Sequence, residues 1–237
     1  MCLTGYGVRL VDVVGNRNRP IDLSFMASLE CDLACAHCMY DSSPKMKMDL
    51  DIPRTHEWMK TIDWEQVNGV GLYGGEPGIK LPLYEAIISR VPWDIPRFVI
   101  TNGTWSTDEH RTKEFLWFAL DYKLAIIVSG SKWHTPHQNR KVLEAIAARD
   151  TGIRLKGEEG SIIPMGRAVQ WWPNGWKCTR LCERWKGPVR IALRPPGEII
   201  FQSCDGQYPV VGGWEMGFDE IVSRISSTFM NCPGSGR

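Results

Sequence analysis

Residues 31–38 read CDLACAHC, so that three cysteines, Cys31, Cys35 and Cys38, fall on one short segment. Thiolate is the soft ligand that iron–sulfur clusters and zinc prefer, and three thiolates on one loop can converge on a single metal centre. The spacing favours an iron–sulfur cluster with one iron left without a protein ligand. A zinc site that adds His37 or a remote histidine is an alternative, as are cysteines that only pack in the core.

Predicted strands and helices alternate around this segment. The strands begin at Ile21 and run into the cysteine segment, then cover 70–73, 97–100 and 124–129, and one or two more follow at 153 and 162–163. The predicted helices cover 53–60, 81–90, 107–120 and 138–149. Repeated strand–helix units indicate an α/β fold with a parallel sheet and right-handed crossovers. In such sheets the chemistry lies at the carboxyl ends of the strands.

After about residue 171 the pattern changes. Strands at 189–193 and 198–201 flank a turn at 194–197, which predicts a β-hairpin, and residues 218–225 have helical spacing. We therefore expect two domains, residues 1–170 and 171–237. The second domain would carry a closed set of four thiolates, suited to a structural or electron-carrying centre. Zinc and plain buried thiols are the alternatives for this set, which consists of Cys178, Cys182, Cys204 and Cys232.

Composition places the chain among ordinary globular proteins. It has 237 residues, 43% of them hydrophobic and 23% charged, with a net charge of +1. No apolar run approaches the ~18 residues of a membrane helix, and no leader pattern opens the sequence, so we expect a cytoplasmic protein with no membrane partner. Residues 151–194 hold nine Lys or Arg, three acidic residues and four Trp. We interpret this segment as a solvated surface over packed Trp side chains, with phosphate and base binding as the alternative.

A second motif stands at the end of the predicted strand 70–73, where residues 74–77 read GGEP. Two glycines allow a backbone to come close to a ligand, and the carboxylate of Glu76 beside them can bind an ammonium group. The two motifs, in this order and each after its strand, resemble the signature of the radical S-adenosylmethionine (SAM) superfamily. The resemblance covers residues 21–168.

This resemblance implies a partial (β/α)6 TIM-like barrel and a [4Fe–4S] cluster on Cys31, Cys35 and Cys38, whose open iron chelates the amine and carboxylate of SAM. It also implies one-electron cleavage of SAM to methionine and a 5′-deoxyadenosyl radical, which abstracts hydrogen from a substrate. The family usually has an aromatic residue before the third cysteine, and His37 takes that place. The expected cofactor-binding residues are His37, Tyr40, Gly74, Gly75, Glu76, Pro77, Thr101, Asn102, Ser129 and Ile163.

The C-terminal cysteines resemble those of the twitch and SPASM extensions of radical SAM enzymes, which hold auxiliary iron–sulfur clusters. The implied protein is oxygen-sensitive and takes electrons from a low-potential donor such as flavodoxin or ferredoxin. Its substrate would be a peptide, a nucleotide or a nucleic-acid base, and no residue is assigned to completing the radical reaction. The competing hypothesis is a non-catalytic zinc-binding module whose basic, Trp-rich C-terminal segment binds nucleic acid.

Overall fold

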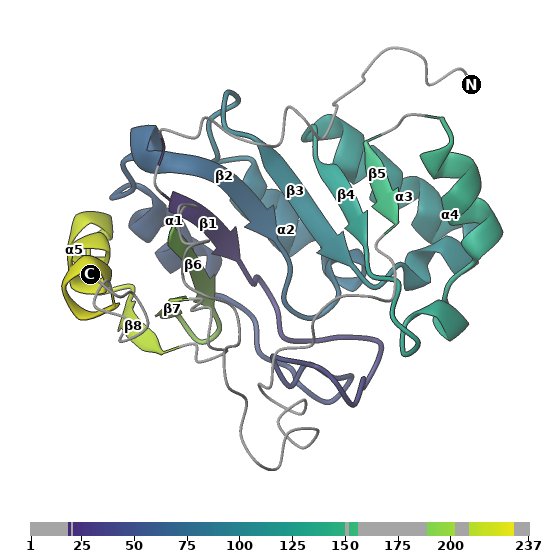
Figure 1. The fold of residues 1–237 in the computed structure, drawn as a ribbon, viewed down its shortest axis with the longest axis horizontal. Coiled ribbons are helices and arrows are strands. Elements are labelled where there is room, and N and C mark those ends of the chain that lie inside the picture. The colour runs from purple at the N-terminus through teal and green to yellow at the C-terminus, as the bar shows by residue number, and fades with distance from the viewer. Residues whose placement is uncertain (1–18, 20, 150–151, 156–188, 202–208, 230–237) are drawn as a thin grey trace, which may run out of the picture.

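A computed structural model describes residues 19, 21–149, 152–155, 189–201 and 209–229. Its centre is an eight-stranded sheet with the strand order β5-β4-β3-β2-β1-β6-β7-β8, which is open at β5 and β8 (Figure 1). The pairs from β5 to β6 are parallel, and the pairs β6–β7 and β7–β8 are antiparallel. The strands are β1 Ile21–Phe25, β2 Val67–Leu72, β3 Arg97–Thr101, β4 Ala125–Val128, β5 Ile153–Leu155, β6 Val189–Arg194, β7 Glu198–Phe201 and β8 Val210–Gly213.

Three of the α-helices begin where the sequence supplies a capping side chain. The side chains of Asp51, Asp108 and Asn139 each accept a hydrogen bond from a backbone N–H of the first turn, and these caps start α1, α3 and α4. The α-helices are α1 Ile52–Met59, α2 Leu81–Ile88, α3 Glu109–Asp121, α4 Arg140–Ala147 and α5 Phe218–Phe229. Short 3₁₀ helices are η1 Trp64–Gln66, η2 Pro77–Ile79, η3 Thr104–Thr107 and η4 Thr135–His137. None of the helices in the described ranges is both long and apolar enough to cross a membrane.

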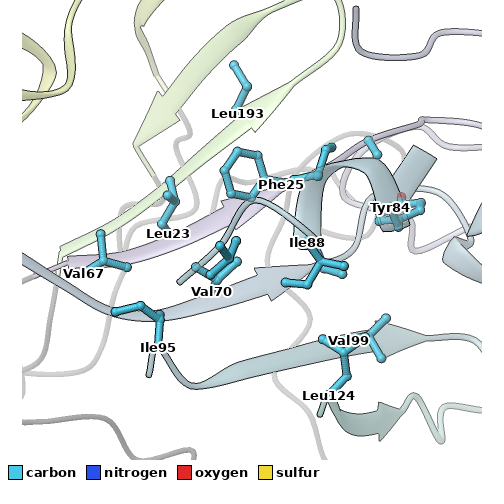
Figure 2. Close-up of a cluster of buried hydrophobic side chains, with 14 of the residues drawn as sticks. Leu23, Phe25, Val67, Val70, Tyr84, Ile88, Ile95, Val99, Leu124 and Leu193 are labelled. Atoms are coloured by element: carbon cyan, nitrogen blue, oxygen red, sulfur yellow. The ribbon is translucent and has the colours of Figure 1, made fainter. Parts of the chain in front are cut away.

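One face of the sheet carries the main hydrophobic core. Alternate strand residues such as Leu23, Val70 and Val99 point to this face, because side chains along a strand alternate between its two sides (Figure 2). They pack against buried residues of all five α-helices. A smaller buried cluster of Met26, Tyr73, Ala192 and Ile200 lies apart from this core. The helices thus cover one face, and the loops at the carboxyl ends of the parallel strands are left for a site.

The architecture confirms the expected α/β fold of the partial-barrel kind, and the sheet is mostly parallel and not closed. The predicted hairpin forms as β6 and β7, and the predicted helix forms as α5. Both belong to the main sheet and core, since β6 pairs in parallel with β1 and Phe218 joins the main cluster. The predicted domain boundary at residue 170 lies outside the described residues, so the division into two domains stays a prediction.

Candidate functional site

The three N-terminal cysteines lie on one closed loop at the carboxyl end of β1. The chain leaves β1 and returns beside itself, where Leu29 N donates to Met48 O at 2.9 Å and Leu50 N donates to Ala27 O at 2.8 Å. Isolated bridges join residue 28 to residue 49 and residue 30 to residue 43. Residues 31–42 therefore form a loop with a closed neck, called the cysteine loop below, and all three of its cysteines are partly buried.

The sulfur of Cys31 receives two hydrogen bonds. Leu33 N donates to Cys31 Sγ at 3.4 Å, and Asn102 Nδ2 donates to it at 3.7 Å. Burial raises the pKa of the Cys31 thiol to about 12, and the nearby carboxylates of Glu76 and Asp32 act in the same direction. Within the described part of the chain, no three ligand-type side chains already converge. The residues nonetheless fit a metal centre with thiolate ligands. The hydrogen bonds donated to the Cys31 sulfur stabilise its thiolate form, and a bound metal supplies the positive charge that favours loss of the thiol proton.

The two glycines of the GGEP motif allow the end of β2 to pack against the chain that enters the cysteine loop. Gly75 N donates to Ser28 O at 2.8 Å, and Glu76 N donates to Glu30 O at 2.9 Å. A β-carbon on Gly75 would lie 1.7 Å from Glu30 O, and one on Gly74, whose φ is +138°, would lie 2.6 Å from Ser28 O. The sequence suggested that these glycines admit a ligand. In the described residues, the group that comes so close is the protein's own backbone.

Glu76 is a buried carboxylate, only 1% exposed, that joins the ends of β2 and β3. It accepts hydrogen bonds from Thr101 Oγ1 at 2.6 Å, from Asn102 N at 2.7 Å and from Gly78 N at 2.9 Å. Burial raises the pKa of Glu76 to about 7, although the three hydrogen bonds oppose this shift. A carboxylate has about four acceptor positions, so the donors among the described residues leave one position for a further donor. A cationic donor there would favour the ionised form.

A second carboxylate, that of Asp32 in the cysteine loop, is hydrogen-bonded by the segment that follows β3. Sequence reasoning missed this residue. Asn102 Nδ2 donates to Asp32 Oδ1 at 2.7 Å, and Thr104 Oγ1 donates to Asp32 Oδ2 at 2.5 Å. Two predicted cofactor contacts, Thr101 and Asn102, are therefore buried and hydrogen-bonded to the protein's own carboxylates. The signal that could have found Asp32 is its position inside the cysteine motif, where it is the one acidic residue between Cys31 and Cys38.

The loop after β4 reaches the cysteine loop through aromatic contacts. His37 stacks on Trp133 with ring centroids 4.2 Å apart and an interplanar angle of 19°, and it meets His134 edge-on at 5.0 Å. Ser131 Oγ and His134 Nδ1 are 2.9 Å apart. Burial lowers the pKa of His134 to about 4, and His37 and His137 add to this effect. His134 is therefore a neutral imidazole at neutral pH.

The other predicted site residues divide into described and undescribed ones. Tyr40 lies 5.9 Å from Tyr73, ring to ring, and Pro77 is buried at the start of η2. Ser129 is held by its backbone, since its N–H donates to Thr101 O at 2.9 Å and its carbonyl accepts from Gln138. The predictions that lie outside the described residues are those for Ile163, Cys178, Cys182, Cys204 and Cys232 and for most of the basic, Trp-rich segment.

Comparison with known proteins identifies the fold. No protein-family model matches the sequence, and no curated protein matches it significantly. Among solved structures, BtrN in complex with AdoMet and 2-DOIA matches with a TM-score of 0.62 at 15% identity, over 88% of this chain and 84% of BtrN. SuiB of Streptococcus suis bound to precursor peptide SuiA matches with a TM-score of 0.48 at 12% identity, over 96% of this chain and 69% of SuiB.

A third match is coproporphyrinogen III oxidase (HemN) from Escherichia coli, whose structure is described as that of a radical SAM enzyme. Its TM-score is 0.37 at 10% identity, over 95% of this chain and 56% of HemN. All three proteins are radical SAM enzymes, and of the three BtrN has the TM-score above 0.5 that shows a shared fold. The chain therefore has the fold of a radical SAM enzyme, as the two sequence motifs predicted.

Proposed function

We propose that this chain is a radical SAM enzyme. The observation that carries the proposal is the arrangement at the carboxyl ends of β1, β2 and β3, in a fold shared with BtrN. Three thiols stand on the closed loop after β1, and the GGEP segment after β2 packs directly against the chain that enters this loop. A GGEP turn by itself is a common strand ending. Its hydrogen bonds to Ser28 and Glu30 place it beside the only cysteine triplet in the sequence.

In this proposal Cys31, Cys35 and Cys38 hold a [4Fe–4S] cluster, and SAM binds across the neighbouring strand ends. When bound, the cluster, reduced by the electron donor, would supply one electron to the sulfur–C5′ bond of SAM, giving methionine and a 5′-deoxyadenosyl radical that would take a hydrogen atom from the substrate. The chain's own residues bind and orient SAM and exclude water. The proposed SAM contacts are His37, Tyr40, Gly74, Gly75, Glu76, Pro77, Thr101, Asn102, Ser129 and Ile163.

The proposed role of Glu76 is to accept a hydrogen bond from the ammonium group of SAM at its remaining acceptor position. Such a charge-assisted contact contributes about 1.5–3 kcal/mol, which corresponds to roughly 10-fold to 100-fold in affinity. We expect Glu76→Gln to weaken SAM binding by this factor and to leave the iron content unchanged, as measured by equilibrium dialysis and iron analysis.

The matched control for Glu76→Gln is Glu30→Gln, which removes the same charge close to Gly75. The Glu30 carboxylate pairs with Lys47 and, at 3.0 Å, with Lys80, and only the Glu30 backbone carbonyl bonds to Glu76, so this variant should bind SAM as the wild type does. Equal SAM affinity for the Glu76→Gln variant and the wild type would count against the proposed contact.

We also propose that Cys178, Cys182, Cys204 and Cys232 hold an auxiliary iron–sulfur cluster. We further propose that the substrate is a peptide, a nucleotide or a nucleic-acid base, and that the electron donor is a low-potential protein such as a flavodoxin or a ferredoxin. The four cysteines form a complete ligand set in sequence, and nine basic residues with four Trp lie between residues 151 and 194. BtrN was crystallised in complex with AdoMet and 2-DOIA, and SuiB was crystallised bound to precursor peptide SuiA.

Metal analysis tests both cysteine sets. Two [4Fe–4S] clusters would give about eight iron atoms per chain after anaerobic reconstitution, and the variant with Cys31, Cys35 and Cys38 replaced by Ala should retain about four. The protein should be brown and lose its visible absorption in air. Stoichiometric zinc and no iron in the wild type would instead support a zinc-binding module, whose nucleic-acid binding would then be the function to measure.

A further inference from the structure

Asp32 holds the cysteine loop against the segment that follows β3 and against α3. Its side chain is 26% exposed, and its two oxygens accept hydrogen bonds from Asn102, Thr104 and Arg111. The first two donors come from the segment after β3, and Arg111 Nη2 lies on α3 at 3.4 Å from Asp32 Oδ2. A carboxylate between the first two cysteines thus ties the loop to two elements that are far away in sequence.

The same carboxylate lies next to the first sulfur. Cys31 Sγ is 4.0 Å from Asp32 Oδ1, and Asn102 Nδ2 is within hydrogen-bond range of both atoms. One amide group therefore links the sulfur and the carboxylate. Because the Asp32 charge is so close to the sulfur, it acts on any charge that a metal centre there gains or loses.

On the basis of the proposed function, we propose that Asp32 and Arg111 act as a pair that sets both the position and the reduction potential of the cluster on the cysteine loop. Neither is a catalytic residue, since each acts through Cys31. Adding an electron makes the cluster more negative, so a neighbouring carboxylate disfavours reduction and a neighbouring guanidinium favours it. The hydrogen bonds that Asn102 and Thr104 donate to Asp32 hold the loop in place without adding charge.

This pairing predicts shifts of opposite sign in the reduction potential. In the full chain, reconstituted anaerobically, Asp32→Asn should raise the midpoint potential of the cluster, and Arg111→Met should lower it. The measurement is a potentiometric titration followed by electron paramagnetic resonance, in the background of the C-terminal cysteines replaced by Ala, so that one cluster is observed. A role in folding alone would not produce shifts of opposite sign.

Two further variants separate charge from position. Lys113→Met removes a positive charge from the same helix as Arg111, but Lys113 is 65% exposed and pairs with Glu109, so the potential should stay at the wild-type value. Thr104→Val removes one hydrogen bond to Asp32 and no charge. It should leave the potential unchanged and speed iron release to a chelator roughly tenfold, as the loss of an outer partner of a metal ligand typically does.

The outcomes distinguish this inference from the proposed function. If the wild type loads iron and cleaves SAM but Asp32→Asn leaves the potential unchanged, or if Asp32→Asn and Arg111→Met shift it in the same direction, the inference is overturned and the proposed function stands. A wild type that holds no iron would overturn the proposed function and this inference with it. Shifts of opposite sign, with Lys113→Met unchanged, support the inference.

Discussion

The Cys35→Ala variant, reconstituted anaerobically with iron and sulfide, is expected to form no 5′-deoxyadenosine when it is mixed with SAM and a low-potential reductant. A cluster held by three cysteines has no replacement for a missing thiolate in this loop, because the fourth iron position must stay open for SAM. The loss should be complete. Chromatography with mass detection of the nucleoside measures it.

The control for this variant is Cys2→Ala, since Cys2 belongs to neither group of cysteines in the sequence. It should produce 5′-deoxyadenosine at the wild-type rate. Iron bound by the C-terminal cysteines can persist in Cys35→Ala, so the product and not the colour is the decisive reading. Wild-type production of 5′-deoxyadenosine by Cys35→Ala would contradict the assignment of the cysteine loop.

The second large effect is expected for Gly75→Ala. The added β-carbon would lie 1.7 Å from Glu30 O and 2.4 Å from the Glu30 carbonyl carbon, so the backbone that leads into the cysteine loop must move away. Forcing a methyl group into such a contact should lower the free energy of unfolding by at least about 3 kcal/mol. It should also reduce iron loading, because Gly75 and Glu76 hydrogen-bond to that same backbone. Thermal unfolding and iron analysis measure the two effects.

Gly217→Ala is the matched control for this substitution. A β-carbon at Gly217 would meet no atom within 4 Å, so the same chemical change should leave unfolding and iron loading near wild-type values. If the Gly75→Ala variant has the unfolding temperature and the iron content of the wild type, the GGEP segment does not pack closely on the chain that enters the cysteine loop.

Local sequence patterns were sufficient for most of the elements. The predicted strand 97–100 forms as β3 and the predicted helix 53–60 forms as α1, with ends that differ by one residue. These predictions succeed because strand alternation, proline in a first turn and polar caps are properties of neighbouring residues. The order of the motifs along the chain likewise placed the cysteine loop and the GGEP segment at the ends of successive parallel strands.

Contacts between distant residues could not be predicted in the same way. Strand β6 was expected in a separate hairpin, yet it pairs in parallel with β1, which lies more than 160 residues earlier in the sequence. The run of buried residues Ile191, Ala192 and Leu193 is typical of a strand covered on both faces, which was a signal for this position. Strand β8 was not predicted, since Val210–Gly213 holds two glycines and has no clear alternation.

The site was predicted in part for the same reason. The cysteines and Glu76 were found because their types and spacing are informative by themselves. The partners of Asp32 and the contact of His37 with Trp133 arise only when the loops after β3 and β4 come together. The close approach to Gly75 was expected, but a sequence does not say which group approaches.

The most direct test of the proposed function is the cleavage of SAM by the wild-type protein. The anaerobically reconstituted full chain, mixed with SAM and a low-potential reductant, should release methionine and 5′-deoxyadenosine in equal amounts, and should release neither without the reductant. A protein that is reconstituted with iron and sulfide under these conditions and forms no 5′-deoxyadenosine would contradict the assignment of this chain as a radical SAM enzyme.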